Sequence, residues 1–176
     1  MVNGQRFYNP RMVLFLVLLA VSQSPVKPSQ HGSVTQQIAQ TTVAIEYDRP
    51  VARGRELFGS LVPYDRVWCP GANECTTIAL STDVRINGQA VPAGTYTLWA
   101  KPGEKTWTMI LNRAHPTFHT QHARVEDQDF MKFDVTPKSG PHMETLTFYF
   151  PVVDGRHAEL WFHWGTVIVP LAIDAP

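Results

Sequence analysis

The chain has 176 residues, 44% of them hydrophobic and 17% charged, with 15 basic residues against 15 acidic ones. This profile fits one ordinary globular domain and excludes a disordered or fibrous chain. A net charge of zero lacks the basic footprint of nucleic-acid binding, so we expect no nucleic-acid partner; a small-molecule or glycan ligand and a protein partner stay open.

Residues 1–22 have the pattern of a secretory signal peptide. Arg6 and Arg11 precede the apolar run from Met12 to Val21, and Ser22 follows it. The run is too short to span a hydrocarbon core of about 30 Å. We therefore predict cleavage near Ser22, export to the periplasm or the cell exterior, and no stable membrane anchor afterwards. An uncleaved N-terminal anchor is the alternative.

Residues 23–40 are polar and contain Pro25 and Pro28, which predicts a flexible lead-in without packed structure. Alternation of apolar and polar residues begins at Thr41 and ends at Pro50, as in a strand. The sequence thus predicts one folded domain over residues 41–176.

Further alternating segments follow, and Asn87-Gly88 is a strong signal for a tight turn between two of them. Because no long stretch has helical periodicity, about eight strands are expected in an all-β antiparallel sandwich, with a jelly roll as one possible form. The later segments are 76–80, 84–86, 95–100, 106–111, 131–135, 146–150, 160–164 and 167–171.

Alternation also assigns the two faces of the strands. Threonines and three large aromatics, Trp99, Tyr149 and Trp161, fall opposite the core face, where a solvated surface and a binding platform are both open interpretations. His163 on the same face is expected to pack or to form hydrogen bonds. The predicted core residues are Leu98, Met109, Leu111, Leu146, Phe148, Phe150, Leu160, Phe162 and Trp164.

The stretch from Ile45 to Thr77 concentrates charged, amide and aromatic side chains and is the candidate site. Arginine forks suit carboxylate or phosphate groups, but the acidic residues of the same stretch are equally able to pair with them in a structural network. The candidate ligand-binding residues are Asp48, Arg49, Arg53, Arg55, Tyr64, Trp68, Asn73 and Glu74.

Cys69 and Cys75 are the two cysteines of the chain and bracket a short turn-forming loop. In an oxidising compartment a disulfide between them would contribute roughly 2 kcal/mol and hold Asn73 and Glu74 in place. The alternative is a pair of thiolate metal ligands.

Three histidines, His115, His119 and His122, have spacings that would place them on one face of a helix, where imidazoles bind zinc or copper. No apolar stripe supports that helix, so these residues are weak metal candidates. No cofactor is expected.

Short motifs in a fixed order resemble an exported bacterial family, domain of unknown function 2911. They include Tyr47-Asp48-Arg49-Pro50, Arg53-Gly54-Arg55, Gly71-Ala72-Asn73-Glu74 and Pro92-Ala93-Gly94-Thr95-Tyr96. The resemblance runs from about Thr41 to Ile173 and implies an exported β-rich domain without an established activity. The two cysteines and the His-rich loop depart from the family pattern.

These observations favour a binding domain without enzymatic activity, whose ligand is a small anionic or polyhydroxylated molecule. A hydrolase with Glu74 as acid or base, with or without metal at the histidine loop, is one alternative. A structural protein of the cell envelope that docks a protein partner is the other.

Overall fold

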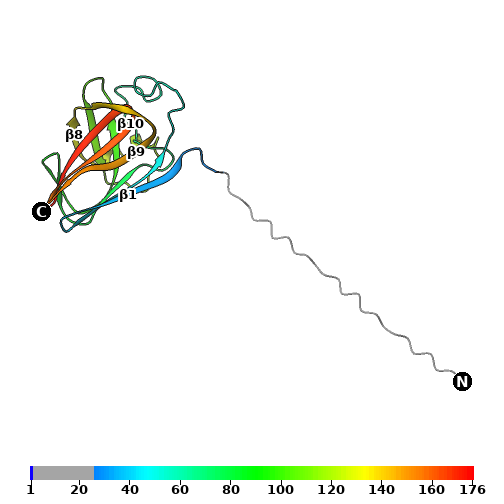
Figure 1. The fold of residues 1–176 in the computed structure, drawn as a ribbon, viewed down its shortest axis with the longest axis horizontal. Coiled ribbons are helices and arrows are strands. Elements are labelled where there is room, and N and C mark those ends of the chain that lie inside the picture. The colour runs from blue at the N-terminus through cyan, green and yellow to red at the C-terminus, as the bar shows by residue number, and fades with distance from the viewer. Residues whose placement is uncertain (2–25) are drawn as a thin grey trace.

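The computed structural model describes residues 26–176 together with Met1, and these residues form two antiparallel sheets packed as a sandwich (Figure 1). The predicted all-β sandwich is confirmed. The predicted cleavage site at Ser22 lies outside the described residues. The strands are β1 (Gln30–Ile38), β2 (Thr41–Arg49), β3 (Thr77–Leu80), β4 (Val84–Ile86), β5 (Gln89–Val91), β6 (Gly94–Lys101), β7 (Trp107–Asn112), β8 (Asp129–Val135), β9 (Lys138–Asp154) and β10 (His157–Asp174).

One sheet has the strand order β1-β2-β3-β6-β7-β8, and the other has the order β5-β4-β10-β9. After β3 the chain leaves the larger sheet, forms the hairpin of β4 and β5 in the smaller sheet, and returns as β6, which pairs with β3. Its turn residues Asn87 and Gly88 both have positive φ, 47° and 79°, as a tight two-residue hairpin requires. The turn predicted from these two residues is confirmed.

The long hairpin of β9 and β10 supplies much of the smaller sheet. Two segments that alternation separates, 160–164 and 167–171, belong to the single strand β10. Register shifts on both sides of Gly165 interrupt the alternation without ending the strand.

The core lies between the two sheets and contains the predicted residues. Eight of the nine predicted side chains are buried, and the ninth, Phe150, is partly buried and packs against them. Burial of each large apolar side chain stabilises the fold by about 1.5 to 3 kcal/mol. Trp164, at 2% exposure, joins a cluster of aromatic rings with Phe58, Trp68 and Phe162.

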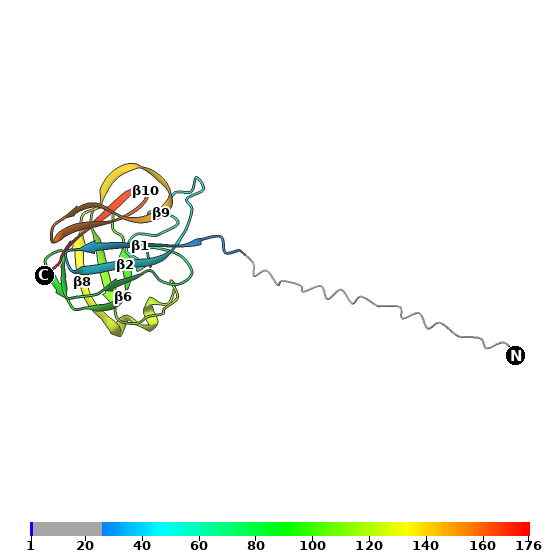
Figure 2. The ribbon, with the colours of Figure 1, turned by 60° about the horizontal axis from the view of Figure 1, so that its bottom comes forward.

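The predicted flexible lead-in over residues 23–40 is wrong for its second half. Gln30–Ile38 is the edge strand β1, which pairs with β2 along nine residue pairs, and Figure 2 shows the two strands side by side. Few apolar residues are needed, since an edge strand is held chiefly by the backbone ladder and covers only part of one face. The turn at Ala39-Gln40 carries no glycine or proline, so the hairpin gives no strong signal in the sequence.

Candidate functional site

Two loop segments meet beside the larger sheet. Segment 50–76 follows β2 and segment 113–128 follows β7. Cys69 and Cys75 of the first and His122 of the second form an outer layer around Trp99, on the face turned away from the core, whereas Phe58 and Trp68 of the first segment pack against the core itself. Their backbones bond to each other, with Cys75 N–H donating to Thr117 O at 2.7 Å and His119 N–H to Asn73 O at 2.9 Å. In Figures 1 and 2 the chain enters β1 at the end of the sandwich where segment 50–76 projects.

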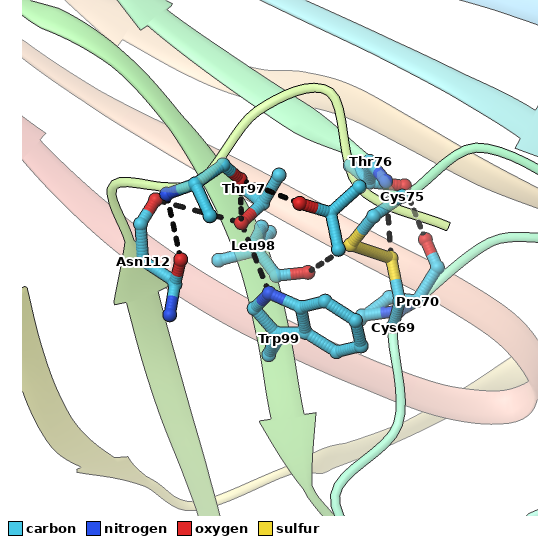
Figure 3. Close-up of a disulfide and its surroundings, with 10 residues drawn as sticks. Cys69, Pro70, Cys75, Thr76, Thr97, Leu98, Trp99 and Asn112 are labelled. Atoms are coloured by element: carbon cyan, nitrogen blue, oxygen red, sulfur yellow. Dashed lines mark hydrogen bonds between the residues drawn. A yellow bond between two sulfur atoms is a disulfide. The ribbon is translucent and has the colours of Figure 1, made fainter. Parts of the chain in front are cut away.

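The predicted disulfide between Cys69 and Cys75 is present and anchors this layer. Figure 3 shows the Trp99 indole beside it, and both cysteines pack with Trp99 and Ile110 in a small outer core. Trp99 Nε1 donates to Thr97 Oγ1 at 3.0 Å. Trp99 therefore lies on the face predicted for it, but it is fully buried and offers no exposed platform.

Trp161, the second aromatic considered for an exposed platform, is partly buried. Its indole Nε1 donates to Glu159 Oε2 at 2.5 Å, and Lys138 Nζ lies 5.3 Å from the ring centroid. On the same strand His163 is 3% exposed, with Nε2 at 2.9 Å from Pro141 O. The expected hydrogen-bonding role of His163 is confirmed.

The loops and the chain that leads into β1 enclose a first cavity of about 540 Å³. Of the predicted site residues it contains Asp48 and Glu74, and β1 and β2 add His31 and Glu46. His31 Nε2 lies 2.7 Å from Glu46 Oε2, and its Nδ1 lies 3.5 Å from Asp48 Oδ1. Asp48 Oδ2 accepts a hydrogen bond from Asn73 Nδ2 at 2.7 Å. This cavity thus presents acceptor oxygens.

A second cavity of about 510 Å³ adjoins the first, because Ser29 lines both. It brings together Arg53, Arg55 and Trp68 of the predicted site with His119 of the histidine loop. The Trp68 ring stacks on Trp164, with centroids 6.1 Å apart and planes 17° apart. Leu61 and Val67 add apolar surface. The second cavity therefore combines cationic side chains with an aromatic and aliphatic wall.

The three predicted arginines have different surroundings. Arg49 lines neither cavity: it crosses to β9, where Nε donates to Leu146 O at 3.1 Å and Nη2 to Thr147 Oγ1 at 2.8 Å. Gly32 makes this path possible, since a Cβ there would lie 2.6 Å from Arg49 Cδ. The structure thus gives Arg49 the role of a tie between the sheets.

Arg55 donates from Nε to Ala52 O at 2.9 Å and from Nη2 to Val51 O at 2.6 Å. These bonds fix the guanidinium while its remaining N–H groups stay available. Arg53 has an exposed side chain, and its backbone N–H donates to Glu144 Oε1 at 2.7 Å. Its φ of +53° is unusual for a residue with a Cβ. Both arginines are therefore placed by backbone contacts at the second cavity.

Glu144, which holds the Arg53 backbone, is itself paired. His142 Nε2 lies 2.8 Å from Glu144 Oε2. Hydrogen bonds from His142 and from the Arg53 backbone hold the pKa of Glu144 below its usual value. The charged form of this carboxylate is thus favoured beside the arginine loop.

Tyr64 lines neither of the two larger cavities. It lines a third, smaller hollow of about 320 Å³ together with Glu56, His142 and Arg55, and Arg55 also lines the second cavity. The segment from Ile45 to Thr77 thus contributes to several places instead of forming one pocket.

The three histidines of the loop do not come together. His115 is exposed, His119 lines the second cavity, and His122 is buried with its ring edge-on to Trp99. Among the described residues, no group of three or more His, Cys, Asp or Glu side chains is arranged to hold a metal ion. Burial lowers the pKa of His119, and the nearby Glu74 carboxylate only partly offsets this. The neutral form of His119 is therefore favoured at pH 7.

Asp129 ties the histidine loop to the sheet. Its Oδ1 lies 3.0 Å from His122 Nε2 and accepts from Asn112 Nδ2 at 2.8 Å, while Lys132 Nζ lies 3.0 Å from Oδ2. Burial raises the pKa of Asp129, but the hydrogen bonds from Asn112, Lys132 and His122 outweigh this, and the pKa lies below its usual value. His122 is thus part of a structural cluster.

Several lining residues were not predicted from the sequence. Leu61 and Val67 are exposed by 43% and 38%, and apolar residues among turn-forming neighbours are a sequence signal for such a surface. Trp164 was assigned to the core, and it does reach the cavity from there. Ser29 and His31 lie in the residues predicted to be a lead-in, so no signal was available for them while that segment was read as unstructured.

The fold and site define a disulfide-bonded antiparallel β-sandwich with two adjoining cavities under its loop layer. The chain belongs to the family described as "Protein of unknown function (DUF2911)", which matches residues 29–173. This match confirms the resemblance and includes β1. No curated protein matches the chain, and no solved structure matches it.

The structure also bears on localisation. Within residues 26–176, no helix is long and apolar enough to cross a membrane. The disulfide is compatible with an oxidising compartment outside the cytoplasm.

Proposed function

We propose that this protein is an exported binding domain, in the periplasm or outside the cell, that holds a small amphipathic anion in the second cavity. The observation that carries the proposal is the union of Arg53 and Arg55 with the Trp68 wall in one cavity of about 510 Å³. Cavities of about 300 to 1,000 Å³ with apolar walls and a few polar groups are typical of small-molecule sites.

The two arginines favour a carboxylate or phosphate group on the ligand. Guanidinium forks bind such groups through paired N–H donors, and Arg55 is held in place by its bonds to Val51 O and Ala52 O. Its position is therefore fixed before a ligand arrives, which reduces the ordering cost of binding.

The remaining wall favours an apolar or planar ligand body. Trp68 and Leu61 offer apolar surface, and neutral His119 offers one donor and one acceptor nitrogen for a hydroxyl or amide of the ligand. The proposal is of binding without a chemical step.

Thermal unfolding of the oxidised protein tests this proposal. The panel contains phenylacetate, octanoate, gluconate, inorganic phosphate, neutral oligosaccharides and divalent metals. A specific ligand at about 100 times its Kd should add about 2.7 kcal/mol, or roughly 5 to 10 °C in Tm. We expect shifts from the carboxylates that carry an apolar body.

The matched variants are Arg53→Ala and Arg66→Ala, since Arg66 is an exposed arginine of the same segment that lines none of the three hollows. Alanine keeps the Cβ, so the backbone strain at Arg53 is unchanged. Loss of the shift in Arg53→Ala with retention in Arg66→Ala supports the site. A shift unaffected by Arg53→Ala, or no shift with any anion, overturns it, and a shift with metals alone favours the enzymatic alternative.

A further inference from the structure

The same parts of the chain line the two cavities in succession. Ser29 lines both. The end of β2 gives residues 46–48 to the first cavity, and residues 50–51 follow in the second. In the loop closed by the disulfide, residues 74–75 line the first cavity and residues 71–72 line the second. In the histidine loop, residues 116–117 line the first cavity and residues 119–120 line the second. Shared walls of this kind place the two cavities side by side, and we call the pair the trough.

Asn73 lies between the residues that line the first cavity and those that line the second. It is the residue between 71–72 and 74–75, and its Nδ2 donates to Asp48 Oδ2 at 2.7 Å and to Ser29 O at 3.4 Å. These bonds join the disulfide loop to β2 on one side and to the chain before β1 on the other. The Asn73 amide, the Asp48 carboxylate and the Ser29 carbonyl therefore meet between the two halves.

The two halves carry opposite charge. Three carboxylates, Glu46, Asp48 and Glu74, line the first cavity together with one cation, Lys27. Arg53 and Arg55 line the second, which has no carboxylate among its described lining residues. His31 pairs with Glu46 and lies near Asp48. Within residues 26–176, the Glu74 carboxylate forms no hydrogen bond or ion pair, so it can accept a donor from a ligand.

We infer that the trough binds a zwitterionic ligand, with an ammonium group beside Glu74 and a carboxylate at Arg53 and Arg55. This inference rests on the proposed function, since it uses the same anion site, and adds a second subsite that fixes the ligand class. Short linear peptides with free termini have this pattern, with an apolar body between two opposite charges. A carboxylate alone fills half of the trough.

Calorimetric titration of the oxidised protein with three forms of one peptide series tests the inference. The probes are Leu-Phe, Leu-Gly-Phe and Leu-Gly-Gly-Phe, each with free termini, N-acetylated or C-amidated. In the best-fitting length, N-acetylation and C-amidation are each expected to weaken binding roughly tenfold, because each removes one charge-assisted contact.

Two variants assign the ends. Glu74→Gln should weaken the free peptide roughly tenfold and leave the N-acetylated form unchanged, and Arg53→Gln should weaken the free peptide and leave the C-amidated form unchanged. Glu104→Gln and Arg66→Gln are matched controls at exposed positions that line none of the three hollows.

Each result is decisive. If N-acetylated and free peptides bind equally and Glu74→Gln has no effect, the second subsite is wrong while the anion site stands. If the carboxylates of the thermal panel bind and no peptide does, the inference is likewise overturned on its own. If neither carboxylates nor peptides bind, both proposals fall together.

Discussion

Asn73 Nδ2 donates a hydrogen bond to Asp48 Oδ2 at 2.7 Å and so joins the disulfide loop to the end of β2. Asp48 is 7% exposed, and Asn73 has a φ of +54°, in the left-handed region that asparagine tolerates better than most residues. The disulfide and this bond fix the loop at two points. The walls of both cavities depend on that loop.

Asn73→Ala is therefore expected to destabilise the protein by about 2.5 to 4 kcal/mol. The loss of a hydrogen bond to a carboxylate costs about 1.5 to 3 kcal/mol, and alanine in the left-handed region adds roughly 1 kcal/mol. Urea unfolding measures the total loss in unfolding free energy for each variant. Asn73→Gly removes the bond but relieves the backbone, so it should be less destabilising; equal losses in the two variants would contradict the backbone part.

Arg49→Met tests the role of Arg49 as a tie between the sheets. Loss of the bonds to Leu146 O and Thr147 Oγ1 should cost about 1 to 3 kcal/mol in urea unfolding, while methionine keeps most of the side-chain volume that crosses Gly32. Arg85→Met is the control, because among residues 26–176 the Arg85 side chain donates only to Gly88 O, within its own hairpin. Its expected cost is within about 0.5 kcal/mol.

Ligand binding separates this structural role from the one predicted from the sequence. Folded Arg49→Met should bind the anions of the thermal panel as the wild type does, because Arg49 lines neither cavity. A folded Arg49→Met variant that no longer binds these anions would show that Arg49 does contribute to ligand binding.

Residue patterns predicted the architecture better than the site. Alternation in β9 reveals that Leu146 and Phe148 face the core, and the Asn87-Gly88 turn has a strong chemical signature. Edge strand β1 has no such pattern, since its stability comes from backbone pairing that any residues can make. Alternation also assigns Trp99 to a face without revealing that a loop distant in sequence covers that face.

Residues of the candidate segment line all three hollows, but the sequence does not say which residue belongs to which. An arginine that ties two sheets and an arginine that faces a cavity have the same side chain, and only the tertiary structure separates Arg49 from Arg53. The disulfide was predictable because two cysteines in a short loop leave few alternatives. The contribution of His119 was not, because it depends on how loop 113–128 docks.

The lowered pKa of Asp129 predicts that the protein loses stability in acid. Its pKa in the folded protein lies below the usual value of 3.8. The folded state thus binds fewer protons than the unfolded state, so the contribution is complete above about pH 4 and is lost as the pH falls through the folded pKa. We expect the difference in unfolding free energy between wild type and Asp129→Asn to shrink from pH 6 to about pH 3.

The exposed neighbour Asp127 provides the control. Urea unfolding of Asp127→Asn across the same range should follow the wild type more closely than Asp129→Asn does. A constant difference between wild type and Asp129→Asn would show that the carboxylate charge adds nothing to the cluster with His122 and Lys132.

The lowered pKa of His119 predicts a second loss of stability on acidification, in a less acidic pH range than that of Asp129 and coupled to the binding site. Burial holds its folded pKa below the usual value of 6.5, so the unfolded state binds the proton more readily. The contribution of neutral His119 is complete above about pH 6.5 and is lost as the pH falls towards the folded pKa. Thermal unfolding from pH 7.5 to 5 should show the wild type losing more stability than His119→Gln, with exposed His115→Gln following the wild type.

A bound ligand tests whether His119 faces the second cavity. An anion bound there offsets the desolvation of the imidazolium, so a saturating carboxylate should reduce the pH-dependent loss of stability in the wild type and leave the pH dependence of His119→Gln unchanged. If the carboxylate stabilises both proteins equally at every pH, then His119 does not face the bound anion, and the ligand is held by the arginines and the Trp68 wall alone.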